Sequence, residues 1–286
     1  MAPSGPTVHR RQLGGELRRL RESAGLLIEH AAQELACSQT RVSRIETGKG
    51  GAVAKPDDVL KLCALYKVAD DRQIQMLLDM LTISQQKGWW EAFEDVLPSG
   101  LEVYVGLESD ARSERAWEPL LVHGLLQTPD YARSLLHAAR IHRPSDIDDL
   151  IQVRAERQKL LSRSSGPLEL WAILDEAVLR RPNGGWDVMS SQIGHLIEMS
   201  ELPNITIQVV EFSKGAHPGL GGAFALLEFE EDPAVVYVDS PAGNLYLEKP
   251  RDVRRFVQSF DLLRAVALDP DDSTALLKRA LMQGET

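Results

Sequence analysis

Apolar side chains recur at helical spacing through the first quarter of the chain. Leu13, Leu17, Leu20 and Ala24 lie three or four positions apart, so they fall on one face of a helix that begins near Arg10. The same spacing, interrupted by turn and capping residues, predicts three further helices over about 28–35, 38–47 and 56–66. The N-terminal part is therefore predicted to be all-α.

The pattern changes after Ser164–Pro167, where β-branched and alternating runs appear. Before this stretch, helices are predicted over about 70–87, 108–116, 130–140 and 145–163. After it, strands at 168–174, 205–212, 223–230, 234–239 and 245–247 accompany helices at 175–181, 186–201, 250–267 and 271–283. The fold class is α+β: an N-terminal all-α domain, then a helical region and a mostly antiparallel sheet flanked by helices.

Four segments follow from this pattern. We expect a disordered leader over residues 1–9 and a helical domain over 10–68. A helical connector is expected over 69–100, and a C-terminal domain over 101–283.

The stretch from Gly25 to Gly48 has the form of a helix-turn-helix, with a three-residue turn between two short helices. In the second of these helices Val42 and Ile45 face inward, because they are three residues apart. The opposite face carries side chains that can bond base edges in the major groove: Gln39, Thr40, Ser43 and Arg44. Arg41, Lys49 and Lys55 are the candidates for phosphate contacts. A generic helical bundle with a solvated polar face is the plain alternative.

Residues at fixed spacing make this segment resemble the Xre-type helix-turn-helix of phage repressors and their bacterial relatives. They are Arg21, Gly25, Leu26, Ser38, Val42, Ser43, Ile45, Glu46 and Gly48. The resemblance covers about residues 10–68 and implies a structural ion pair between Arg21 and Glu46. It departs from the family at Leu27 and Ile28, where Ser or Thr and then Gln are usual. A helix cap worth ~1 kcal/mol is lost there, and so is a phosphate contact. A relative that no longer binds DNA therefore stays open as an alternative.

From about residue 101 the sequence is similar to the C-terminal domain, formally of unknown function, of WhiJ-like regulators of actinobacteria. The matching residues include Gly124–Ala132, Arg154, Arg157, Gln158, Leu174–Ala177, Leu179–Arg181 and the stretch from Gly215 to Phe224. The resemblance implies a transcriptional regulator, antitoxin-like in some relatives, with a small BldB-like protein as a possible partner.

The C-terminal domain has one unusual loop, Gly215–Gly222, which contains four glycines. Glycine lets the backbone approach another group closely, so we name it as a possible ligand or partner loop: Gly215, His217, Gly219, Gly221 and Gly222. A flexible loop between strands is the alternative. Arg154 and Arg157 fit a solvated helix face better than a phosphate clamp, and the tryptophans fit a core better than an aromatic pocket.

Charge is unevenly distributed along the chain. The 286 residues have a net charge of −10, which by itself argues against a polyanionic partner. Residues 1–72, however, carry 12 basic and 9 acidic side chains, a net of +3, and the remaining residues carry −13. A mildly basic N-terminal part on an acidic body permits DNA binding by the former.

Several classes of protein are not expected. The first residues lack the apolar run typical of a signal peptide, and no stretch approaches 18 apolar residues, so we expect neither a signal peptide nor a membrane span. Two cysteines form no disulfide framework, so we expect a cytoplasmic, nucleoid-associated protein. Nucleotide-binding glycine fingerprints, the G-x-S-x-G motif and metal-ligand spacings are missing. We therefore expect no catalytic residues, no metal and no cofactor.

Taken together, the sequence predicts a sequence-specific transcriptional regulator. A single small DNA-binding domain gives modest affinity, so we expect a homodimer on double-stranded DNA with a pseudo-palindromic operator and half-sites about 10 bp, or a multiple of it, apart. The C-terminal domain would bind a partner or effector. An antitoxin-like module that neutralises a small protein and a small-molecule sensor both remain alternatives.

Overall fold

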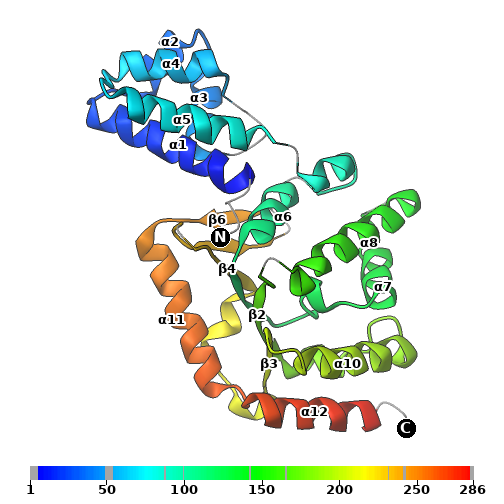
Figure 1. Ribbon diagram of the computed structural model, residues 1–286. Helices are drawn as coiled ribbons and strands as arrows, with labels where there is room; N and C mark the ends of the chain where they lie inside the picture. Colours follow the sequence, from blue (N-terminus) through cyan, green and yellow to red (C-terminus); the bar gives the residue numbers. More distant parts are fainter. Residues whose placement is uncertain are drawn as a thin grey trace. The chain divides into compact units, whose positions relative to one another are not determined.

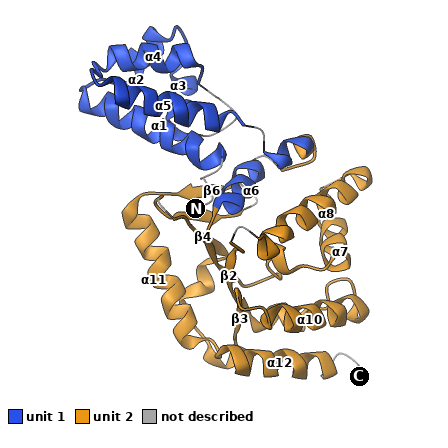
Figure 2. Ribbon diagram, in the orientation of Figure 1, with its two compact units in different colours: residues 1–92, 100–110 blue, residues 93–99, 111–286 orange. Residues whose placement is uncertain are grey.

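The computed structural model describes residues 6–48, 54–86, 88–98, 100–141, 143–164, 166–230, 232–240 and 243–283. They fall into two compact units (Figure 2). The first unit comprises residues 1–92 and 100–110, and the second comprises residues 93–99 and 111–286. Each has its own hydrophobic core.

The first unit is helical (Figure 1). Its core is formed by leucines of α1 and α5, with Val42 and Ile45 of α3 and Leu62 of α4 between them. The helices are α1 (Pro6–Ser23), α2 (Ile28–Glu34), α3 (Gln39–Thr47), α4 (Pro56–Leu65), α5 (Asp71–Ser84) and α6 (Leu101–Asp110), with a short 3-10 helix, η1 (Trp89–Phe93), before α6.

The structure differs from the predicted leader. Helix α1 begins at Pro6, so residues 6–9 are helical, and Val8 is buried. The backbone N–H of Val8 also donates to a carboxylate oxygen of Asp110, at the end of α6. Proline suits the first turn of a helix because that position needs no N–H donor, so Pro6 can begin α1.

The structure also differs from the predicted connector over its first half. Leu77 and Leu81 of α5 are fully buried in the same core as Leu17 of α1. Their spacing of four places both side chains on one face, and Asp70 caps the helix by accepting from the N–H of Arg72. Helix α5 therefore completes the helical unit, and α6, which packs on α1, belongs to it as well.

The second unit is built on a six-stranded mixed sheet with the order β3-β2-β1-β4-β5-β6. β1 pairs with β2, and β2 with β3, in parallel; the other three pairings are antiparallel. The mostly antiparallel α+β arrangement predicted from the sequence is confirmed. The strands are β1 (Ser113–Glu118), β2 (Glu169–Asp175), β3 (Ile205–Val210), β4 (Phe224–Glu228), β5 (Val235–Val238) and β6 (Leu245–Leu247).

Helices cover both faces of this sheet (Figure 1). On one side Phe260 and Leu263 of α11 pack against Trp117, Ile173 and Leu226. The other side is covered by α7, α8 and α10 (Figure 1). The helices are α7 (Pro129–Ala139), α8 (Pro144–Gln158), α9 (Glu176–Arg180), α10 (Trp186–Ser200), α11 (Pro250–Val266) and α12 (Pro270–Gln283). Short 3-10 helices are η2 (Gly124–Leu126), η3 (Lys159–Ser162), η4 (Phe212–Lys214) and η5 (Pro218–Gly221).

Strand β1 was missed, because a helix was predicted over 108–116. The strand reads Ser-Glu-Arg-Ala-Trp-Glu, so it shows no apolar face. Glu114 is nevertheless fully buried, beside Ala116 and Trp117. Charged side chains are usually exposed, whereas Glu114 is buried in a central strand. The hydrophobic pattern therefore did not indicate a strand here.

Among the described helices, none is long and apolar enough to span a membrane. Cys37 and Cys63 are free thiols.

Candidate nucleic-acid interface

Helix α3 is defined at both ends by its own sequence. The hydroxyl oxygen of Ser38, the N-cap, accepts from the backbone N–H of Arg41 at 3.2 Å. Gly48 follows the helix with a φ of 64°, the left-handed conformation that glycine adopts without strain. Val42 and Ile45 face the core with 0% and 4% exposure. The inner face and both ends of this helix are therefore fixed.

The outer face of α3 carries the side chains with base-reading chemistry. All four are exposed, so nothing in the described part of the first unit covers them: Gln39, Thr40, Ser43 and Arg44. Thr47, one turn beyond Ser43, donates its hydroxyl to the Ser43 carbonyl. The face is thus a continuous polar strip along the helix, beginning at its N-terminus.

Arg41 has a partner that the sequence pattern did not indicate. Its guanidinium lies 2.7 Å from a carboxylate oxygen of Asp58, which also accepts from the backbone N–H of Lys55 at 3.0 Å. Burial opposes ionisation of Asp58, but these two hydrogen bonds outweigh it and lower the pKa of Asp58. Arg41 thus joins α3 to the start of α4. The Lys55 side chain is exposed, and Lys49 lies outside the described residues.

Arg21 and Glu46 form a bidentate ion pair inside the first unit. Arg21 Nε and Nη2 donate to the two Glu46 carboxylate oxygens at 2.6 and 2.8 Å, and the side chains are only 9% and 4% exposed. A third bond, at 2.9 Å, runs from Arg21 Nη1 to the carbonyl of Leu26. Hydrogen bonding to Glu46 raises the pKa of Arg21. One guanidinium therefore connects α1, the turn before α2, and α3.

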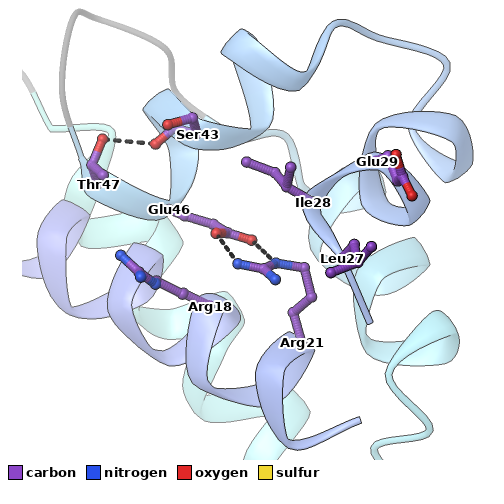
Figure 3. Close-up of a pocket in the computed structure, with 8 residues that line it drawn as sticks. All are labelled: Arg18, Arg21, Leu27, Ile28, Glu29, Ser43, Glu46 and Thr47. Carbon is purple, nitrogen blue, oxygen red and sulfur yellow. Dashed lines mark hydrogen bonds and ion pairs between the residues drawn. The ribbon is translucent and has the colours of Figure 1, made fainter. Parts of the chain in front are cut away.

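A hollow of about 480 Å³ opens beside this ion pair (Figure 3). Leu27 and Ile28, at the start of α2, form its apolar side, and Leu27 is 60% exposed. Leu27 has no side-chain oxygen to cap the first turn of α2, whereas its own backbone N–H is satisfied, because it donates to His30 Nδ1 at 3.0 Å. The remaining lining residues are Arg18, Glu29, Ser43 and Thr47. Helix α3 therefore borders an apolar edge.

The crossing of α1 and α3 depends on Gly14. A Cβ on this residue would lie 2.8 Å from the Glu46 carbonyl oxygen and closer still to that of Ile45. Nothing lies within 4 Å of the equivalent point on Gly15, the next residue. Gly14 is thus required for the close contact that positions α3. Two adjacent glycines look alike in a sequence, and only the structure distinguishes them.

The glycine-rich loop of the second unit is folded over Trp117. The Trp117 indole N–H donates to the Gly219 carbonyl at 2.8 Å, and a Cβ on Gly219 would lie 2.7 Å from Cζ2 of the same ring and closer still to two other ring atoms. The His217 ring packs edge-on against Trp117 at 5.2 Å, and its Nε2 is 3.6 Å from Asp175. Packing thus accounts for Gly219. Gly215 and Gly222 have positive φ values, and the space around Gly221 is open.

Two family models match the chain. One, described as "Helix-turn-helix domain", matches residues 12–74. The other, described as "Domain of unknown function (DUF5753)", matches residues 101–279, more than half of the chain. The chain belongs to the DUF5753 family. No curated protein and no solved structure matches it. The helix-turn-helix match indicates a DNA-binding regulator with a DUF5753 domain as its C-terminal part.

The DUF5753 domain contains a largely buried polar cluster, formed by Glu114 and Glu118 of β1 and by His123. His123 Nε2 lies 3.2 Å from Glu114 Oε1 and 4.0 Å from Glu118 Oε1. Burial raises the pKa of Glu118 to about 7 against the opposing charges of His123 and Arg157. Glu114 and Asp239 also act on Glu118 and add to the rise.

Two arginines of α8 border this cluster, contrary to the solvated face predicted for them. Arg157 is 7% exposed. Arg154 Nε donates to the Gln127 side chain at 3.1 Å, and burial together with the charge of Arg157 lowers the pKa of Arg154 to about 10. Gln127, just before α7, and α8 are thus joined by partly buried polar contacts. Thr128 caps α7 by accepting from the N–H of Tyr131.

Proposed function

We propose that this protein is a sequence-specific DNA-binding regulator of transcription. The observation that carries the proposal is the outer face of α3, where four side chains with base-reading chemistry are all exposed on a helix whose inner face and ends are fixed. In helix-turn-helix proteins such a helix lies in the major groove. DNA binding of this kind would place the protein in the cytoplasm, at the nucleoid.

Each side chain has a role in this proposal. Gln39 would bond adenine and Arg44 guanine in a bidentate manner, while Thr40 and Ser43 contact neighbouring base edges or a thymine methyl. Lys49 and Lys55 would contact phosphates. Arg41 would do so only by sharing or leaving Asp58, so we expect it to contribute less than a free arginine.

The Arg21–Glu46 pair would serve DNA binding indirectly. It holds α3 against α1 and the turn before α2, and neither side chain is exposed enough to bond a base. Leu27 and Ile28 replace the polar residues that cap and contact phosphate in Xre-type relatives. We therefore propose a weaker phosphate contribution at the start of α2, offset by base contacts and by binding as a homodimer to a pseudo-palindromic operator.

For the DUF5753 domain we propose a regulatory role in a WhiJ-like protein, through a bound partner or effector. The loop formed by Gly215, His217, Gly219, Gly221 and Gly222 is one candidate surface, since Leu220 at its tip is 71% exposed. An antitoxin-like function, with a small BldB-like partner, is the second candidate. A small-molecule sensor is the third. Co-purification with a small protein encoded beside the gene would favour the second, and a metabolite that raises the melting temperature would favour the third.

The DNA-binding proposal is tested by selection from a random double-stranded DNA library with the full-length protein. We expect an enriched sequence with two related half-sites whose centres are about one helical turn, or a multiple of it, apart. Recovery of random sequences at all salt concentrations would refute sequence-specific binding. Recovery of a single unpaired half-site would refute the dimeric arrangement alone.

A further inference from the structure

The outer face of α5 carries an apolar groove that no contact described above explains. Met76, 44% exposed, lies in it beside the half-buried Met80 and Ile83, and His9 of α1 forms its other side. An exposed methionine flanked by apolar neighbours is unusual on a helix that has already buried Leu77 and its neighbours in a core. Such a surface is typical of a contact with another molecule.

Charges at the ends of this groove are self-complementary. Arg72 and Asp79 are exposed and line the groove together with Gln75. They are seven residues apart, two helical turns or about 10 Å along one face. Within the described part of the chain Arg72 makes no ion pair, while Asp79 accepts a hydrogen bond from Gln75 at 2.8 Å. One positive and one negative charge thus flank Met76.

We infer that this face of α5 is a dimer interface between two copies of the chain. In an antiparallel pair related by a two-fold axis near residues 75–76, Arg72 meets the partner's Asp79, and Asp79 meets the partner's Arg72. Met76 lies next to the axis, where it packs against the same region of the other copy. A two-fold contact requires one patch to complement itself, and the pattern Arg72–Met76–Asp79 does so.

Other occupants fit this face less well. The groove has one charge of each sign, so neither DNA nor a strongly charged peptide gains a net attraction there. α5 packs on α1 and α4, whereas α3 packs on α1 and α2. A second copy on the outer face of α5 therefore leaves Gln39 and Arg44 accessible to DNA. The inference rests on the proposed function only in that this dimer would place two α3 helices on a pseudo-palindrome.

The experiment is sedimentation velocity of the full-length protein over a concentration series without DNA. A contact made mainly by one helix is small, so we expect a concentration-dependent dimer. R72D and D79R should each shift the midpoint of dimerisation at least tenfold to higher concentration, because each brings like charges together. Neither should unfold the unit, since both positions are exposed and an aspartate suits the first turn of α5. Unchanged circular dichroism and melting temperature would establish that.

Mixing the two variants provides the decisive measurement. R72D offers two acidic groups and D79R two basic ones, so a heterodimer restores both ion pairs. Fluorescently labelled R72D titrated with unlabelled D79R should associate at least as tightly as the wild type. If the wild type is monomeric throughout, if the single variants dimerise like the wild type, or if the mixture stays monomeric, the inference is wrong.

DNA binding separates this inference from the proposed function. Each single variant should bind an isolated half-site as the wild type does and lose only cooperative binding to the full site. If the wild type binds no half-site but the charge-swap result holds, the dimer interface stands and the DNA-binding proposal fails.

Discussion

At the scale of single residues, the sequence indicated the chemistry of the outer face of α3 but not the contacts that hold this helix in place. Four exposed side chains on α3 follow from helical periodicity, since Val42 and Ile45 had to face the core. The partner of Arg41 could not be derived, because Asp58 is seventeen residues away and reaches α3 only once α4 has packed. The sequence offered one indication of this partner, Asp58 itself, an acidic residue in the first turn of α4.

The Arg21–Glu46 pair should contribute strongly to stability. Glu46→Gln leaves a buried guanidinium without its counter-charge, so we expect the free energy of unfolding of the helix-turn-helix unit to fall by about 3 kcal/mol. Urea titration followed by circular dichroism measures it. Glu22→Gln removes an exposed carboxylate that pairs with Arg18 at 2.8 Å and lies 3.8 Å from Arg21, so it should cost much less than Glu46→Gln. Equal losses in the two variants would show that burial of the pair does not matter.

Glu118 should make the DUF5753 domain less stable as pH rises. Its pKa is about 7 in the folded protein, above its ordinary value of 4.5, so the folded state holds the proton more tightly than the unfolded state. The stabilisation is present below pH 4.5 and is lost as pH rises to 7. As the pH rises from 5 to 8, the free energy of unfolding of Glu118→Gln should therefore increase relative to that of the wild type, by up to about 3 kcal/mol.

The measurement is a urea titration at each pH, with the exposed Glu201 changed to Gln as the control. The control should follow the wild type at every pH. If Glu118→Gln also follows it, the carboxyl group of Glu118 is ionised normally in the folded protein.

At the scale of elements, periodicity predicted those with a clear apolar face and failed where a charge is buried. Helices α7, α8, α10, α11 and α12 lie close to their predicted positions. Strand β1 was missed because Glu114 stands where an apolar residue would be expected. A helix is predicted at the position of α5 but within a connector, because the apolar face of a helix does not indicate which core it packs into.

The crossing of α1 and α3 should be sensitive to a single methyl group. Gly14→Ala forces a Cβ against the backbone of Ile45 and Glu46, so we expect a loss of about 1–3 kcal/mol in stability. Gly15→Ala adds the same methyl group in open space on the same helix and should stabilise by about 0.5–1 kcal/mol. Thermal melting of the two variants measures the difference. Stabilisation of both would mean that the helices can separate at no cost.

At the scale of the whole molecule, the net charge of −10 is misleading about partners. The first 72 residues carry +3 and the rest −13, so the acidic excess lies mainly in the DUF5753 domain. Such a domain should be repelled by DNA and should suppress non-specific binding. Salt dependence would then arise from the few cations near α3.

The most direct test of the central claim is the affinity of α3 variants for the selected operator. Gln39→Ala and Arg44→Ala should each weaken binding by about 1–3 kcal/mol, roughly 5- to 150-fold, while binding to random DNA changes little. Gln33→Ala on α2 and Lys61→Ala on α4 are the controls, because they remove an exposed amide and an exposed cation outside α3. Fluorescence anisotropy at a fixed salt concentration gives the dissociation constants. Loss in the α3 variants alone is the predicted result; operator binding as tight as in the wild type would contradict the assignment of α3 as the base-reading helix.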